Sequence, residues 1–154
     1  MCGQPFDAAE PTAARELRKV VTVLFTDVTG STPLGERLDP ESLRRVMGRF
    51  FQAMQAEIER HGGVVEKFIG DAVMAVFGIP RLHEDDPLRL VRAAAAMAAA
   101  LDRLNEELEQ DLGVPVAIRT GIKTGELVAG DPSAGQQLVT GDTVNTAARL
   151  EQAA

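Results

Sequence analysis

Residues 64–78 read VVEKFIGDAVMAVFG, and this stretch decides the fold. It contains two short runs rich in β-branched and apolar residues, 64–69 and 72–77, separated only by Gly70 and Asp71. A two-residue connection with a glycine that can adopt positive φ is typical of a β-hairpin. The stretch therefore predicts an antiparallel strand pair with Asp71 at its tip.

A long helix is predicted on either side of this hairpin. Upstream, Asp39 can cap a helix and Pro40 can occupy its first position, and apolar residues then recur at helical spacing until Gly62 and Gly63. Downstream, a stripe of Leu, Val and Ala follows the same spacing over roughly residues 84–110. We expect both helices to be amphipathic and to cover a sheet.

The remaining strands complete the predicted topology. The run VVTVLF at 20–25 predicts a strand buried on both faces, ending in a polar, glycine-containing loop over 26–32. Further strands are expected at 116–123, 127–130 and 137–140, the first two joined near Thr124-Gly125, before a helix from about Asp142 to the end. This order contains a split βαββαβ core. It predicts an α+β, ferredoxin-like fold: a mostly antiparallel sheet with its long helices packed on one face.

The composition is that of an ordinary globular protein. The 154 residues are 45% hydrophobic and 25% charged, which fits one domain preceded by a polar linker over 1–18. A net charge of −7 argues against a nucleic-acid partner, because affinity for a phosphate backbone comes largely from Lys and Arg. The longest apolar run, 93–101, is far short of the roughly 20 residues that span a bilayer. With one cysteine and no signal pattern, we expect a cytoplasmic protein without a membrane segment.

Two aspartates are the first candidate site residues. Asp27 follows a buried strand, and Asp71 lies at the hairpin tip. Carboxylates held rigidly at such places are the ligands that a hard cation such as Mg²⁺ requires, and they converge if the strand lies beside the hairpin. Each also has a purely structural interpretation, Asp27 as a turn cap and Asp71 as an ordinary hairpin residue.

The segment after Asp27, residues 28–32, is a candidate anion site. Gly30 permits close backbone approach, successive N–H groups before a helix bind anions, and Thr32 adds a hydroxyl. The segment is not a Walker A loop, because the lysine of that motif is missing. The alternative is a plain strand-to-helix turn.

The positions of three further polar residues do not by themselves decide the roles of these residues. Lys67 interrupts an apolar strand, either as a charge that protects a sheet edge, which we favour, or as a donor to a ligand. Asn145 and Arg149 lie one helical turn apart and share a face, which suits a phosphate or is simply solvated. His61 and His83 have no partner at metal-ligand spacing and receive no role.

Taken together, three segments resemble the catalytic domain of class III nucleotidyl cyclases, the adenylate and guanylate cyclase homology domain. They read VLFTDVTGST at 23–32, EKFIGDAVMAVFG at 66–78 and GDTVNTAARL at 141–150, and they occur in the order of that family. The resemblance covers residues 20–154. It implies that residues 19–154 are such a domain, lacking the family's C-terminal strands.

The resemblance implies an adenylyl cyclase that converts ATP to 3′,5′-cyclic AMP and pyrophosphate in cyclic-nucleotide signalling. Two divalent cations, Mg²⁺ or Mn²⁺, would be held by Asp27, Asp71 and the carbonyl of Val28. The β- and γ-phosphates would be bound by Thr29, Gly30, Ser31 and Thr32. One cation would lower the pKa of the attacking ribose 3′-hydroxyl while the other stabilises the leaving oxygens.

The resemblance also assigns the remaining polar residues. Lys67 would face the purine, and a lysine at this position accompanies ATP in the family. Asn145 would orient the ribose, and Arg149 would neutralise charge on the reacting phosphate. The family forms head-to-tail homodimers with shared active sites, so the cation ligands and the Lys, Asn and Arg set would come from different chains.

One position departs from the family pattern. Leu138 occupies the second purine-reading position, where family members often carry Asp, Thr or Ser, so base selectivity would rest on Lys67 and backbone groups. The segment CGQPF at 2–6 resembles the end of a zinc ribbon, and we expect the chain to be part of a longer multidomain protein. The alternative function is a non-catalytic nucleotide-binding or dimerisation module. A diguanylate cyclase is disfavoured, because the Gly-Gly-acid-Glu-Phe signature is missing from the hairpin tip.

Overall fold

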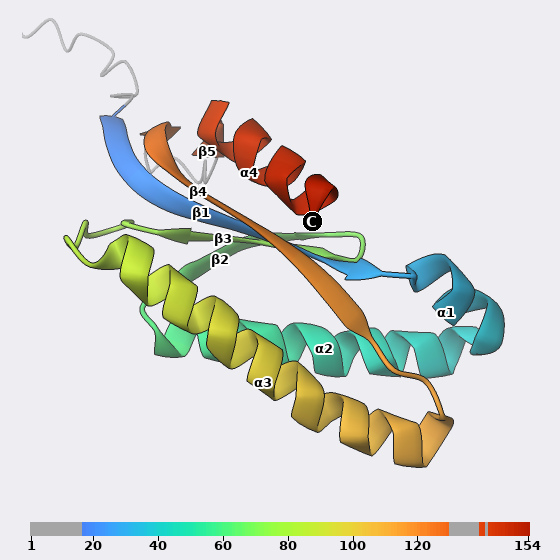
Figure 1. The fold of residues 1–154 in the computed structure, drawn as a ribbon. Helices are drawn as coiled ribbons and strands as arrows, with labels where there is room; N and C mark the ends of the chain where they lie inside the picture. The colour runs from blue at the N-terminus through green and yellow to red at the C-terminus, as the bar shows by residue number, and fades with distance from the viewer. Residues whose placement is uncertain (1–16, 130–138, 141) are drawn as a thin grey trace, which may run out of the picture.

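An antiparallel sheet carries helices on both of its faces (Figure 1). The computed structural model describes residues 17–129, 139–140 and 142–154. In chain order its elements are β1 (Leu17–Thr29), α1 (Ser31–Arg37), α2 (Pro40–Arg60), β2 (Val64–Ile69), β3 (Ala72–Phe77), α3 (Asp86–Leu112), β4 (Ala117–Ala129), β5 (Val139–Thr140) and α4 (Asp142–Ala153). The strands lie in the order β2-β3-β1-β4-β5, and each neighbouring pair is antiparallel. The predicted α+β fold with a split βαββαβ core is confirmed.

The hairpin formed by β2 and β3 is present as predicted. Ile69 pairs with Ala72 across the two-residue turn, and Gly70 adopts a φ of +60°. The left-handed conformation is open to glycine without steric cost, so the sequence can reverse direction in two residues. β2 lies at one edge of the sheet and β3 pairs with the central strand β1, which brings the turn beside the end of β1.

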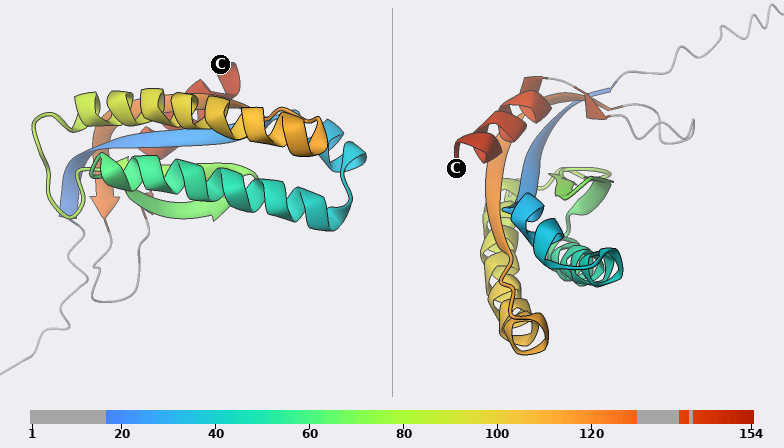
Figure 2. Two further views of the ribbon diagram at one scale, coloured as in Figure 1. Left: turned by 90° about the horizontal axis from the view of Figure 1, so that it is seen from below. Right: turned by 90° about the vertical axis from the view of Figure 1, so that its right-hand side faces the viewer.

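The two faces of the sheet are covered by different helices. α2 and α3 lie on one face and α4 on the other (Figures 1 and 2). Along β1, Leu24 and Val28 pack with α2 and α3, whereas Val21 and Val23 pack toward α4. This alternation with a period of two confirms that the strand is buried on both faces. The long helices lie on one face, as predicted.

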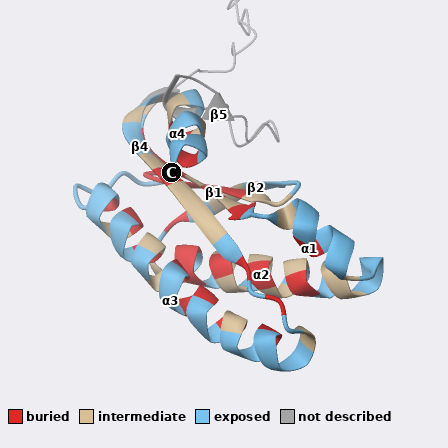
Figure 3. Ribbon diagram, turned by 45° about the vertical axis from the view of Figure 1, so that its right-hand side comes forward, coloured by how far each residue is buried: buried red, intermediate tan, exposed pale blue. Residues whose placement is uncertain are grey.

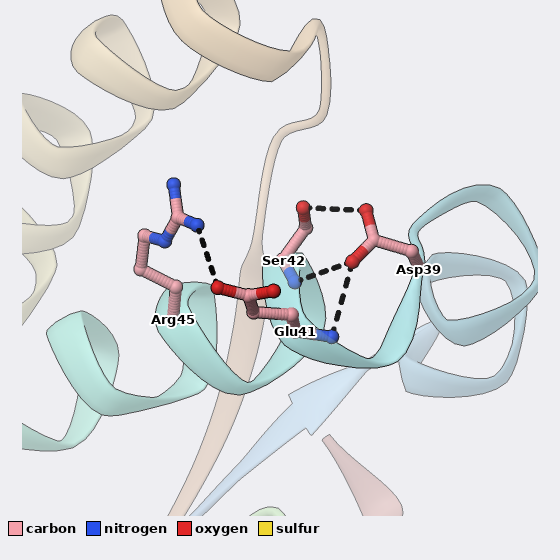
Figure 4. A network of polar contacts seen from close by, with 4 residues as sticks. All are labelled: Asp39, Glu41, Ser42 and Arg45. Atoms are coloured by element: carbon pink, nitrogen blue, oxygen red, sulfur yellow. Dashed lines mark hydrogen bonds and ion pairs between the residues drawn. The ribbon is translucent and has the colours of Figure 1, made fainter.

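α2 begins at the predicted cap. The Asp39 carboxylate accepts hydrogen bonds from the backbone N–H groups of Glu41 (3.1 Å) and Ser42 (3.0 Å), and from the Ser42 hydroxyl (Figure 4). The hydrogen bonds from Ser42, first of all its hydroxyl, lower the pKa of Asp39. Glu41 and Arg45, one turn apart, form an ion pair at 3.6 Å. Burial in Figure 3 alternates along α2 and α3 as expected for amphipathic helices.

Several boundaries differ from the prediction. β1 begins at Leu17, within the linker expected over 1–18 and ahead of the strand expected at 20–25. The expected loop over 26–32 is wrong, because β1 continues to Thr29 and a short helix, α1, begins at Ser31. Thr26 is fully buried, and its hydroxyl is 2.8 Å from that of Thr120 on β4. A polar residue can therefore extend a buried strand when a neighbouring strand supplies its hydrogen-bond partner, which a sequence pattern does not reveal.

The expected break near Thr124 and Gly125 is also wrong. β4 is one continuous strand, in which these residues pair with Thr22 and Val21 of β1. The ladder with β1 extends over the whole of β4, and its hydrogen bonds outweigh the local turn preference of glycine. β5 begins at Val139, and residues 137–138 of the predicted strand lie outside the described residues. The same holds for residues 2–6.

Candidate active site

Asp27 lies near the end of β1 on the face that α4 covers. Strand alternation places it on the same face as Val21 and Val23, which pack toward that helix. It is paired with Ala72 on β3 and with Arg119 on β4. Its side chain retains 20% of its exposure, so the carboxylate is held by the sheet yet reachable from solvent.

Asp71 lies beside Asp27 on the neighbouring backbone. The N–H of Val28 donates a hydrogen bond to the carbonyl oxygen of Asp71 at 3.3 Å. Because Asp27 pairs with Ala72 and Val28 bonds to Asp71, the two aspartates lie at the same end of the β1–β3 pair, offset by one residue. Two residues 44 positions apart in the chain (71 − 27) are thus brought to one end of the sheet.

Two charged residues that the sequence argument did not select contact this site. The guanidinium of Arg119 donates to the Asp27 carboxylate, with Nη2 3.4 Å from Oδ2. The Nε of Arg119 lies 2.6 Å from Oε1 of Glu151 on α4. Glu151 is 6% exposed, so α4 delivers a buried carboxylate to the guanidinium. We refer to Asp27, Arg119 and Glu151 as the acid–arginine cluster.

The pKa values in this cluster reflect its burial and its charges. Burial raises the pKa of Glu151, the negative charge and the direct side-chain contact of Asp27 raise it further, and Arg119 opposes the change. Burial disfavours the charged form of Arg119, but its hydrogen bond to Asp27 and its close ion pair with Glu151 outweigh this and raise the pKa of Arg119. The cluster therefore holds one guanidinium between two carboxylates.

No sequence rule singled out these two residues, but a weak signal existed. Arg119 is a charged residue within a run that otherwise suits a buried strand. Lys67 stands out in its own strand for the same reason. The pairing of Arg119 with Asp27 depends on the register of β1 with β4, and the contact of Glu151 depends on how α4 docks. Neither is encoded in local periodicity.

The docking of α4 on β4 is very close. A Cβ at Gly121 would lie 2.3 Å from the carbonyl oxygen of Ala147 and from the backbone nitrogen of Glu151. Only a residue without a side chain permits this approach. Gly121 and Ala147 therefore fix the height of α4 above the sheet, and with it the position of Glu151.

Lys67 lies on the same face of the sheet as Asp27. It pairs with Met74, which packs on the α4 face, whereas its neighbour Phe68 turns to the other face and contacts the ring of Phe51 at a centroid distance of 4.8 Å. Lys67 is exposed, and β2 is the edge strand of the sheet. This placement fits both of the roles considered for it, edge protection and ligand contact.

Asn145 and Arg149 are both exposed on α4. The helix directs Ala147 and Glu151 toward the sheet instead. The structure therefore brings Glu151, rather than Asn145 or Arg149, to Asp27 within one chain. The shared face of Asn145 and Arg149 is directed to solvent in the single chain.

The candidate phosphate segment begins at the exit of β1. Gly30 has a φ of +70° and precedes α1, and its carbonyl accepts a hydrogen bond from the N–H of Leu34 at 3.1 Å. Thr29 and Thr32 are exposed, and Ser31 is half-buried. The segment thus lies next to Asp27 and faces solvent. Leu138 lies outside the described residues.

The oxygen donors here suit a hard divalent cation. Asp27 and Asp71 supply carboxylates on adjacent rigid backbones, and Val28 supplies a backbone carbonyl. Within the described ranges, no three His, Cys, Asp or Glu side chains are grouped as a complete metal site. A site built here would draw its remaining ligands from backbone, water or substrate, as Mg²⁺ sites commonly do.

Comparison with known proteins identifies the family. A family model described as the adenylate and guanylate cyclase catalytic domain matches residues 14–154. The chain is 32% identical over 138 residues to an adenylate cyclase of Anabaena cylindrica and 37% identical over 132 residues to an uncharacterized protein of Mycobacterium tuberculosis. These alignments cover 85% and 83% of the chain but 26% and 23% of the relatives. The chain thus spans about a quarter of the length of these curated relatives.

Solved structures agree with this assignment. The guanylyl cyclase Cya2 matches with a TM-score of 0.83 and 33% identity, over 90% of this chain and 72% of that one. The adenylyl cyclase CyaB from P. aeruginosa matches with a TM-score of 0.82 and 33% identity, over 89% of this chain and 73% of that one. The protein belongs to the class III adenylate and guanylate cyclase catalytic domain family. In the described part of the chain, no helix has the length and apolar character to cross a bilayer.

Proposed function

We propose that this chain is the catalytic domain of an adenylyl cyclase that converts ATP to 3′,5′-cyclic AMP and pyrophosphate. The observation that carries the proposal is the placement of Asp27 and Asp71 on adjacent backbones at one end of the sheet, next to the solvent-facing segment that begins at Thr29. Because the chain spans only part of its relatives, its place in a longer cytoplasmic signalling protein is part of the proposal.

In this proposal Asp27, Asp71 and the carbonyl of Val28 bind two divalent cations, Mg²⁺ or Mn²⁺. The cations would activate the ribose 3′-hydroxyl and neutralise charge on the phosphates. Asp27 and Asp71 contribute rigid anchoring, because both are fixed by backbone pairing within the sheet. The N–H groups and hydroxyls of residues 29–32 bind the β- and γ-phosphates beside them.

Lys67 is the proposed reader of the purine. It is exposed near the hairpin tip, on the same face as Asp27, and a lysine can donate hydrogen bonds to acceptors on adenine. Leu138 would pack against the base, so Lys67 and backbone groups would provide the polar discrimination. Both adenylyl and guanylyl cyclases are found among the structural neighbours, and Lys67 is the reason to favour ATP.

Asn145 and Arg149 are proposed to act on the substrate of a second copy of the chain. Both face solvent on α4, away from the Asp27 end of their own sheet. A head-to-tail homodimer would place them over the partner's cation ligands, with Asn145 orienting the ribose and Arg149 neutralising charge on the reacting phosphate. Each active site would then be shared between two chains.

Product identification tests the proposed activity. The chain is incubated with ATP or with GTP in the presence of Mn²⁺, and the products are separated by chromatography and mass spectrometry. We expect 3′,5′-cyclic AMP from ATP, and its loss by about 10³-fold or more in Asp27→Asn and Asp71→Asn. Asp102→Asn, on the exposed side of α3, is the matched control. Nucleotide binding without either cyclic product would instead support the non-catalytic module.

A mixing experiment tests the shared site. Asp27→Asn and Arg149→Ala each remove activity alone, because every site in either homodimer lacks one essential group. In an equimolar mixture, exchange forms heterodimers in which one site contains both native residues. We expect activity to recover toward about a quarter of wild type for random pairing. A mixture as inactive as its components, with exchange confirmed by differently tagged chains, would contradict the shared site.

A further inference from the structure

The acid–arginine cluster is not symmetric about its guanidinium. Arg119 lies 2.6 Å from Glu151 through Nε, but 3.4 Å from Asp27 through Nη2. Glu151 is 6% exposed and Asp27 is 20% exposed. The shorter contact is therefore also the more buried one, where a lower dielectric strengthens the attraction. Arg119 thus makes its closer ion pair with Glu151, while its hydrogen bond goes to Asp27 over the longer distance.

The backbone of Glu151 has little freedom to move. The backbone nitrogen of Glu151 is one of the two atoms that a Cβ at Gly121 would meet at 2.3 Å, so this turn of α4 rests directly on β4. Arg119 is itself fixed in β4 by its pairing with Asp27. Two backbones in direct contact thus set where the guanidinium lies between its two carboxylates.

A guanidinium so close to Asp27 competes with any other cation for the same carboxylate. If Arg119 paired fully with Asp27, a divalent cation would have to break a charge-assisted hydrogen bond before binding. Glu151 offers Arg119 a second carboxylate, which satisfies its charge away from Asp27. One acidic residue on α4 can in this way determine how available Asp27 is.

We propose that Glu151 is a positioning residue that holds Arg119 off Asp27 and thereby keeps the Asp27 carboxylate available to a divalent cation. This inference rests on the proposed role of Asp27 as a cation ligand. It assigns no contact between Glu151 and the substrate or the cation. The proposed effect of Glu151 on the cation is exerted through Arg119. The Glu151 carboxylate also interacts with Asp27 directly, and a double-mutant cycle separates the two effects.

Cation affinity, measured without turnover, tests the proposal. Mn²⁺ binding to the purified chain is followed by electron paramagnetic resonance of the free ion at constant pH. We expect Glu151→Gln to weaken binding by about tenfold, because Arg119 is left with Asp27 as its carboxylate partner in the cluster. Glu106→Gln, which removes an equal charge from the exposed side of α3, should leave binding within about twofold. Circular dichroism and thermal unfolding establish that each variant is folded.

A double-mutant cycle separates positioning from a simple charge effect. In an Arg119→Met background, the guanidinium that Glu151 restrains is gone. Glu151→Gln should then change Mn²⁺ affinity by less than about twofold. An equal tenfold loss with and without Arg119 would overturn the proposal, because it would show that Glu151 acts on the cation through its own charge. No loss in Glu151→Gln alone would overturn it as well.

Asp27→Asn distinguishes failure of this inference from failure of the proposed function. If Asp27→Asn binds Mn²⁺ as tightly as wild type, Asp27 is not a cation ligand, and the proposed function is contradicted. If Asp27→Asn loses binding while Glu151→Gln retains it, the function stands and the positioning role is wrong. Loss in both variants, with the coupling to Arg119 described above, supports both.

Discussion

The two faces of the sheet are built from the same strands but differ in what they carry. The face under α2 and α3 is filled by apolar side chains such as Leu24, Phe50 and Met97. The face under α4 has a smaller apolar cluster, and its charged residues Asp27 and Arg119 lie at one end of it. Successive residues of β1 alternate between these two environments.

This difference shows how one sheet can combine a stabilising apolar face with a face that carries a candidate active site. Burial of large apolar side chains is the main source of folding free energy, and here it is concentrated on one face. The other face can therefore hold charged groups that would be costly in a fully packed core. The short helix α4, whose Ala147 rests on Gly121 of β4, covers it only in part.

The strongest test of this comparison is Phe50→Ala set against Asp27→Asn. Phe50 is fully buried on α2, and its truncation should lower the free energy of unfolding by about 3–5 kcal/mol. Asp27→Asn should change the free energy of unfolding little, because a nearly isosteric side chain remains in a partly exposed position. Urea denaturation measures both. A loss for Asp27→Asn as large as that for Phe50→Ala would break the division between the two faces.

Gly121→Ala tests how α4 is held on its face. The added methyl would meet backbone atoms of α4 at 2.3 Å, so the helix must shift, at a cost of about 1–3 kcal/mol in the free energy of unfolding. Gly48→Ala is the matched control, since a Cβ there meets nothing within 4 Å and lies within α2. It should stabilise the chain by roughly 0.5–1 kcal/mol. In thermal denaturation, the melting temperature should fall for Gly121→Ala and rise for Gly48→Ala.

Lys67→Glu tests whether the face of the sheet under α4 determines the preference for ATP over GTP. The residue is exposed, so stability should change little, but the ratio of kcat/KM for ATP over GTP should fall by about tenfold. An acidic side chain loses a donor to adenine and gains an acceptor for guanine. Arg44→Glu on α2 reverses an equal charge away from the site and should leave the ratio unchanged. An unchanged ratio in Lys67→Glu would remove Lys67 from base recognition.

The smallest expected effect is the pH dependence of the α2 cap. Hydrogen bonds from Ser42 lower the pKa of Asp39 in the folded chain. A carboxyl with a lowered folded pKa contributes stability above its unfolded pKa, and that contribution is lost as pH falls through the folded value. Stability of the wild type should therefore decline more steeply with acidification than that of Asp39→Asn. Melting temperatures measured from pH 6 down to about pH 3 compare the two.

Much of the fold followed from local patterns. The hairpin bounds and the start of α2 at Pro40 match the prediction, because Gly70, Asp39 and Pro40 act on their own neighbours. The errors occurred where a neighbouring strand decided the outcome. Thr26 continues β1 through its hydroxyl partner on β4, and Gly125 continues β4 through its pairing with Val21. Such partners lie about a hundred residues away in the sequence, beyond the reach of a periodicity argument.

The residues of the candidate site also fall into two groups, those that the sequence indicated and those that only the structure revealed. Asp27, Asp71, Lys67, Asn145 and Arg149 were selected from sequence, and the structure places the first three near one end of the sheet or on one of its faces. Arg119 and Glu151 were missed, although they contact Asp27 or its partner. Their importance arises from register and helix docking rather than from a motif.

The sequence by itself determined most of the strands and helices and pointed to the candidate residues of the site, because capping, turn formation and side-chain alternation act over a few residues. Only the tertiary structure decided that a guanidinium on β4 lies between a carboxylate of β1 and a buried carboxylate of α4. Electrostatic interaction depends on distance and burial in space, and these are set only when distant segments pack together.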